Sequence, residues 1–231
     1  MQTVHPPVLR AAAAAMCIFA LAAVDADAAD FGIYGEVGTF GLGGGAVVQF
    51  NERFSARAGY STISQDIDDY DPEDLEFDAD ATIGAAKFLV DWYPTPSGFR
   101  VTAGAMLNQT KATAVAVPTG GGYTINDTFY PSATIGSANG RIDFDRFAPY
   151  LGVGFGRALD TAGHFNVLVD IGAAFVGKPN VDLTATCGIS APTPLCARLQ
   201  EDVAAEQADV EDDTDNLKVW PHINLAFSWR F

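Results

Sequence analysis

Apolar and polar residues alternate along most of the chain, and this period of two predicts β-strands. The pattern is clearest in the last segment, where Ile223, Leu225 and Phe227 are apolar and the positions between them are polar or small. The same alternation recurs upstream, so that eight strands are predicted. They span 31–40, 43–50, 54–65, 81–92, 99–117, 143–157, 165–176 and 217–231. The chain is therefore predicted to be all-β, with antiparallel strands running up and down.

The charged residues assigned to these strands fall on the polar face and leave the opposite face apolar. A soluble sandwich that buries its apolar face fits this pattern as well as a membrane barrel that turns the apolar face to lipid. Aromatic residues at strand ends, such as Trp92 and Phe99, favour the barrel, because aromatic girdles mark the bilayer interfaces. The polar-face residues are Glu36, Arg57, Lys87, Asp91, Arg100, Asp170, Lys218, His222 and Arg230.

The predicted connections also alternate in length. Short ones lie at 51–53, 93–98 and 159–164, and long ones at 66–80, 118–142 and 177–216. Outer-membrane barrels have short periplasmic turns and long outer loops. We therefore expect an eight-stranded antiparallel up-and-down transmembrane β-barrel, with its polar face inside and its three long loops outside.

The N-terminal segment reads as a secretory signal peptide. Fourteen apolar residues at 11–24 follow Arg10, and Ala26 and Ala28 supply a small-residue cleavage site. The apolar run is too short to span a bilayer as a helix. We expect a signal peptide at 1–28 and the barrel at 29–231, the alternative being a buried core helix.

These features together resemble the small outer-membrane β-barrels of Gram-negative bacteria, namely the OmpA transmembrane domain and the OmpW-like proteins. The resemblance rests on the signal peptide, the eight alternating strands and the aromatic residues Phe227, Trp229 and Phe231 at alternate positions of the last strand. It implies a location in the outer membrane, contact with its lipid, and an assembly signal at Phe227, Trp229 and Phe231 that the barrel-assembly machinery reads. It does not imply one activity, because this fold serves structural proteins, adhesins, channels and lipid-modifying enzymes.

Charge excludes one class of partner. The chain has 13 Lys and Arg against 29 Asp and Glu, with a formal net charge of −16. So acidic a chain is not expected to offer a basic surface along which a phosphate backbone could bind, so no nucleic-acid partner is expected.

The most acidic segment is 66–80, where clustered carboxylates could hold Ca²⁺. The spacing does not match an EF-hand, and a solvated loop is the alternative. The candidate calcium ligands are Asp66, Asp68, Asp69, Asp71, Glu73 and Asp74.

The last long loop carries two further features. Cys187 and Cys196 lie nine residues apart, and in an oxidising compartment they are expected to form a disulfide. The Ala-rich, acidic stretch 197–213 has apolar residues partly at helical spacing, which predicts a short surface helix.

No motif points to catalysis. The sequence has no G-x-S-x-G, no H-E-x-x-H and no Gly-rich phosphate loop, so we expect no enzyme activity and no cofactor. The polar-face charges would fill a narrow barrel as ion pairs or, alternatively, line a path for small solutes. We therefore expect a structural or surface-interaction role through the acidic outer loops, towards a surface ligand that the sequence does not identify. The alternative is a narrow porin-like or OmpW-like channel.

Overall fold

The computed structural model describes residues 30–71, 75–117, 121–159, 164–189, 191–214 and 217–231. The expected signal peptide at 1–28 lies outside the described residues. The described chain is all-β with antiparallel pairings, apart from one α-helix and one 3₁₀ turn. None of its helices is long and apolar enough to cross a membrane.

Eight strands pair side by side in an uneven ring, and β13 returns to pair with β1. Every pairing around the ring is antiparallel. In spatial order the strands are β1 (Asp30–Gly38), β2 (Gly41–Asn51), β3 (Phe54–Asp71), β4 (Leu75–Trp92), β5 (Phe99–Asn108), β10 (Phe147–Phe155), β11 (Phe165–Phe175) and β13 (Val219–Arg230).

The ring is uneven because β3 and β4 are much longer than their neighbours. Their ladder runs from the pair Phe54–Trp92 to the pair Asp71–Leu75, and it continues well past the ring. The β10–β11 ladder, by contrast, covers only 150–155 on β10. The whole sheet has 11 strands, three more than the ring, which corrects the prediction of eight.

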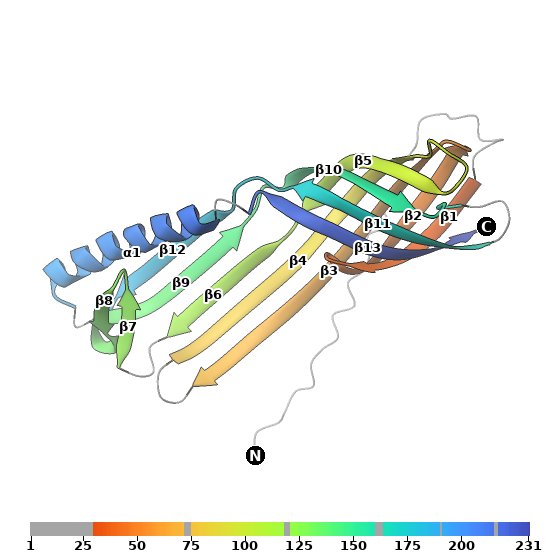
Figure 1. Cartoon of the computed structure of the whole chain (residues 1–231). Helices are drawn as coiled ribbons and strands as arrows, with labels where there is room; N and C mark the ends of the chain where they lie inside the picture. The colour runs from red at the N-terminus through yellow and green to blue at the C-terminus, as the bar shows by residue number, and fades with distance from the viewer. Residues whose placement is uncertain (1–29, 72–74, 118–120, 160–163, 190, 215–216) are drawn as a thin grey trace, which may run out of the picture.

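The additional strands form an extension of the sheet beyond the ring (Figure 1). We use the name extension for these strands together with the small elements packed on them. The sheet continues through β6 (Lys111–Val117), β9 (Ile135–Asp143) and β12 (Asn180–Cys187). The small elements are β7 (Gly122–Ile125), β8 (Thr128–Pro131), the 3₁₀ turn η1 (Ser132–Thr134) and α1 (Thr193–Thr214).

These elements correct the prediction that 66–80, 118–142 and 177–216 are loops. Segment 66–80 contains the ends of β3 and β4, and the other two segments contain the strands and the helix of the extension. The acidic composition of 66–80 suggested a loop, yet apolar residues such as Ile67 and Phe77 recur within it. Strand pairing with β6 outweighs the low β-propensity of Asp, as tertiary context often does.

The predicted strand 99–117 is divided in two at Gln109 and Thr110. Both halves pair with β4: β5 along 85–92 and β6 along 76–82. At the break the backbone N–H of Thr110 donates to Asn108 Oδ1 at 3.0 Å. This side-chain bond takes the place of a hydrogen bond to a neighbouring strand. The break lets β5 turn into the ring while β6 follows the extension.

The β7–β8 hairpin has a signal in the sequence that the alternation alone does not reveal. Its two turn residues, Asn126 and Asp127, have φ angles of 47° and 57°. Positive φ at both central residues is the requirement of a type I′ hairpin turn, and Asn and Asp tolerate it better than most residues. Asn-Asp between short apolar segments therefore predicts this hairpin.

The helix α1 covers the outer edge of β12. It is longer than the predicted 197–213 and buries Leu199 and Val203. Gln207 Oε1 accepts the backbone N–H of Leu183 at 3.2 Å, and Gln200 Nε2 donates to the carbonyl of Ala185 at 2.9 Å. Side chains of the helix thus take the place of a neighbouring strand, which protects an edge that could otherwise pair with another chain.

Candidate functional site: the interior of the ring

Two arginines and two aspartates form a buried layer across the ring. Arg57 on β3 donates to Asp91 through Nε at 2.8 Å and to Asp170 through Nη1 at 2.9 Å. Arg100 on β5 donates to Asp170 at 2.6 Å and lies 3.5 Å from Asp91. The four side chains are at most 2% exposed. Because they come from β3, β4, β5 and β11, the layer ties opposite sides of the ring together.

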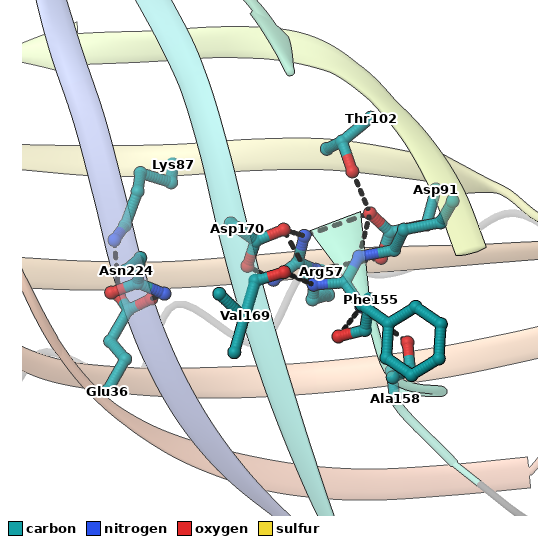
Figure 2. A network of polar contacts seen from close by, with 12 residues as sticks. Glu36, Arg57, Lys87, Asp91, Thr102, Phe155, Ala158, Val169, Asp170 and Asn224 are labelled. Atoms are coloured by element: carbon teal, nitrogen blue, oxygen red, sulfur yellow. Dashed lines mark hydrogen bonds and ion pairs between the residues drawn. The ribbon is translucent and has the colours of Figure 1, made fainter. Parts of the chain in front are cut away.

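Neutral groups add hydrogen bonds to this layer, which we call the arginine layer, although Arg100 Nε makes none. Thr102 donates to Asp91 Oδ1 at 2.7 Å, and Ser55 donates to Asp91 Oδ2 at 3.2 Å. Arg100 also donates to the carbonyls of Phe155 at 3.3 Å and Gly156 at 2.5 Å. Figure 2 shows Arg57 between Asp91 and Asp170, with Thr102 reaching Asp91. These partners matter, since a buried charge without any partner would cost several kcal/mol.

A second charged group, which we call the lysine layer, lies beside the first in Figure 2. Lys87 on β4 forms an ion pair with Glu36 on β1, and both side chains are at most 2% exposed. Ser61 donates to Glu36 Oε1 at 2.5 Å, and Asn224 donates to Glu36 Oε2 at 2.9 Å. The lysine layer therefore joins β1, β3, β4 and β13.

Apolar and aromatic side chains fill the interior towards the extension. His222 is buried with its ring 5.5 Å from that of Phe40 and 5.4 Å from that of Tyr150. Phe40 and Tyr150 belong to a buried cluster that also contains Leu89 and Met106. His222 therefore lies in an aromatic contact and not in a chain of ion pairs.

The opposite end of the interior is filled by the connection after β10. Ala158 and Leu159 are buried in a cluster with Tyr34, Val47 and Leu168. The backbone N–H of Ala158 donates to Tyr93 Oη at 3.1 Å, and its carbonyl accepts from Ser228. The described interior therefore holds two charged layers with an apolar cluster towards each end, and its buried Arg100 Nε, Tyr150 Oη and His222 Nδ1 atoms have no hydrogen-bond partner.

The structure groups most of the predicted polar-face residues, with two exceptions. Glu36, Arg57, Lys87, Asp91, Arg100, Asp170 and His222 are buried inside the ring. Lys218 is instead exposed in the turn before β13, which begins at Val219 and not at 217. Arg230 is partly exposed at the end of β13 and pairs with Asp30 at 2.8 Å. The predicted strand began two residues too early, which included Lys218, whereas Arg230 is the last residue of β13, where the side chain on the inward alternation is only partly covered.

The outward face of the ring is apolar and exposed. Phe147, Leu151 and Ile223 are 61%, 55% and 57% exposed, although each alternates with a buried neighbour. The three residues of the expected assembly signal, Phe227, Trp229 and Phe231, lie on this face too. Soluble proteins rarely expose apolar patches as extensive as a whole sheet face, so this surface requires an apolar neighbour.

The predicted disulfide is present, and it joins two elements of the extension. Cys187 at the end of β12 is bonded to Cys196 in the first turns of α1, with a Cα–Cα distance of 5.8 Å. The bond therefore fixes the helix to the strand whose edge it covers.

The structure does not test the calcium prediction at 66–74; among the side chains that it describes, no group of three or more potential metal ligands occurs. The side chains of the candidates at 66–74 lie outside the described residues. Their backbone belongs to β3 or to the undescribed 72–74, and Asp66 pairs with Asp80.

One contact of the extension joins β8 to α1 and has no signal in the sequence. Tyr130 on β8 is fully buried and donates to Asp202 on α1. Burial, followed by this contact, raises the pKa of Tyr130 to about 12, and the hydrogen bond from Tyr130 lowers the pKa of Asp202. No spacing rule connects residues so far apart in the chain, so only the fold reveals the pair.

Comparison with known proteins identifies the fold. No protein-family model and no curated protein matches the chain. It is similar to the crystal structure of CarO from Acinetobacter baumannii, with a TM-score of 0.54, 22% identity, and coverage of 87% of this chain and 97% of CarO. It is equally similar to CarO2 of that organism, with a TM-score of 0.54, 23% identity, and coverage of 87% and 98%. The chain therefore has the fold of CarO, an outer-membrane β-barrel protein.

Proposed function

We propose that the chain is an integral outer-membrane protein, built as a closed eight-stranded barrel, with a structural or surface-interaction role and no catalytic activity. The observation that carries this proposal is the occupied interior: the arginine layer and the lysine layer span the ring, and apolar clusters fill it on either side. An interior occupied by these layers and clusters disfavours transport through the ring, and it favours a structural or surface-interaction role.

The outward face supports the placement in a membrane. Its exposed apolar side chains would contact outer-membrane lipid, whereas in water they would form one large apolar patch. Closure of the ring matters for the same reason, because an unpaired strand edge in lipid leaves backbone groups without partners. The barrel-assembly machinery is the proposed partner during insertion, through Phe227, Trp229 and Phe231.

The position of the extension indicates which end of the barrel would face outwards. It lies at the end of the ring away from the C-terminus (Figure 1). In outer-membrane barrels the short turns and the chain ends face the periplasm. The extension, with its acidic helix α1, would then face outwards and offer the surface for interaction with other molecules.

Planar-bilayer conductance of the purified protein tests the proposal. Insertion is first verified by resistance of the barrel to added protease. The inserted protein is expected to give no unitary current steps, because ions would have to displace both charged layers. Reproducible current steps from the parent protein would overturn the structural role and favour the narrow channel for small solutes.

A double variant, Glu36→Ser with Lys87→Ser, is the matched control for this measurement. It removes one ion pair and leaves the arginine layer intact. If the arginine layer suffices to block the interior, the variant also remains silent. Current steps from this variant alone would show that the two layers close the interior jointly.

A further inference from the structure

The sheet of the extension has two edges, and among the described residues only one of them is covered. At the first edge, α1 bonds to the backbone of β12 through Gln200 and Gln207. The second edge belongs to β3, because β2 pairs with it only along 54–62, whereas β4 pairs with it along 54–71. Figure 1 shows β3 and β12 along opposite margins of the extension.

The uncovered edge is the segment 64–71, which we call the β3 edge. Its backbone pairs with β4 on one side, and no described strand pairs with it on the other. At about 3.3 Å per residue, the β3 edge is roughly 25 Å long. In a strand, N–H and C=O groups point alternately to its two sides, so the open side presents unpaired donors and acceptors. Such a row is a template on which another strand can pair.

The charge of the β3 edge determines which strand it can accept. Four of its residues are Asp and none is basic. The neighbouring strand adds to this charge, since Asp78 and Asp80 of β4 lie opposite Asp68 and Asp66 in the ladder. A second copy of the edge would bring like charges opposite each other, which is destabilising. A strand with Lys or Arg at alternate positions would form opposite-charge pairs instead. The acidic positions are Asp66, Asp68, Asp69 and Asp71.

We propose that the β3 edge binds an extended, basic segment of a partner protein as an additional strand of the extension. Backbone hydrogen bonds would supply the affinity, and the aspartates would select the charge of the partner. The inference rests on the proposed surface-interaction role and names the place and the partner class for it. It does not depend on whether the barrel conducts.

The probe is an eight-residue peptide of alternating Lys and Thr, added to isotope-labelled protein in a non-ionic detergent. Amide hydrogen exchange followed by NMR is the readout. We expect saturable binding with slower exchange of amides within 64–71, and no binding of the same peptide with Glu in place of Lys. A third peptide keeps the lysines but is N-methylated at every peptide bond, so that it cannot donate backbone hydrogen bonds. It should not bind, and equal binding of this peptide would reduce the contact to charge alone and overturn the proposal.

Reversal of charge on the protein provides the second arm. Asp66→Lys with Asp68→Lys should weaken binding of the Lys peptide about tenfold or more and allow the Glu peptide to bind. Asp209→Lys with Asp212→Lys makes the same change in net charge at exposed positions of α1, and it should change neither. If the first pair does not fold, Asp66→Ser with Asp68→Ser serves the same purpose and should weaken binding of the Lys peptide.

Three results would overturn the proposal. The first is absence of saturable protection within 64–71 in the parent protein, and the second is equal affinity of the parent and the charge-reversed variant for the Lys peptide. The third is protection of 64–71 that rises with protein concentration without peptide, since it would identify a second copy as the occupant. A protein that is silent in the bilayer and binds no Lys peptide would overturn this inference alone and leave the structural role standing.

Discussion

Arg57 lies between two buried carboxylates and pairs with both of them. Asp91 and Asp170 both accept from its guanidinium group, and the three side chains are almost completely buried. Arginine suits this place because its planar group offers several donors in fixed directions. The net contribution of such a pair is modest, whereas removing one partner is costly, because the other charge stays buried.

Arg57→Met should therefore lower the free energy of unfolding by about 3–5 kcal/mol. The measurement is urea unfolding in lipid vesicles, followed by tryptophan fluorescence. Arg141→Met is the matched control, since the Arg141–Asp143 pair is 55% and 37% exposed and should cost less than about 1 kcal/mol. Equal effects of the two substitutions would contradict the importance of the arginine layer.

The outward residues give a second prediction at this scale. Leu151→Arg should destabilise the barrel in lipid by about 2–4 kcal/mol, because it places a charge against the bilayer interior. Phe129→Arg changes a residue that is similarly exposed but lies in the extension, and its effect should be small. The same unfolding assay compares the two. Loss of stability in both variants alike would argue against a lipid-facing ring.

Among the elements, β12 and α1 depend on each other. The edge of β12 has its backbone groups satisfied by two glutamines of the helix, and the disulfide keeps the helix in place. Without these contacts the strand would present free donors and acceptors to other chains. The helix therefore stabilises the sheet at its end without adding a strand.

Gln207→Ala should speed hydrogen exchange of the Leu183 amide, because that N–H loses its acceptor. Gln200→Ala is the matched control, since it frees the carbonyl of Ala185 and leaves the Leu183 N–H bonded. Amide exchange followed by NMR measures both. Equal protection of Leu183 in the parent and Gln207→Ala would show that the helix does not cover the edge in solution.

The contact between Tyr130 and Asp202 makes docking of α1 depend on pH. The lowered pKa of Asp202 means that its contribution is present above its ordinary pKa of 3.8 and is lost as pH falls through the lowered value. The pKa of Tyr130 is raised, so its contribution is present below 10 and is lost as pH rises through about 12. Tyr130→Phe should return the pKa of Asp202 towards 3.8, as measured by carboxyl NMR titration. An unchanged titration would exclude the hydrogen bond as the cause.

For the whole molecule, β13 closes the ring against β1, and the proposed insertion into the outer membrane would depend on it. Changing Phe231 and Trp229 together to Ser should lower the amount of protein in the outer-membrane fraction of cells. The reason is loss of the proposed assembly signal, so refolding in detergent should suffer less. Immunoblots of fractionated cells provide the measurement.

Val219→Ser is the control for this experiment, because it changes an exposed residue at the other end of the same strand. It should leave the amount in the outer membrane unchanged. Parent-like amounts of the double variant would contradict the signal, and recovery of the parent protein in the soluble periplasmic fraction would contradict the membrane location.

The alternation of the sequence determined much of the ring. It placed eight predicted segments on strands that pair around the ring, it separated the apolar outward face from the polar inward face, and the spacing of Cys187 and Cys196 predicted their bond. These features are local: side chains on a strand alternate between two faces whatever the strand pairs with. Local pattern was therefore enough to find them.

The tertiary structure alone decided the rest. Which of the inward charges pair, and that Lys218 does not lie among the buried ones, depends on register between strands distant in sequence. The extension depends on the same long-range pairing, since β6 and β9 extend a sheet whose acidic strands looked like a loop. The partners of a strand, and the helix that covers its edge, are fixed by contacts across the whole chain, which no short window of sequence contains.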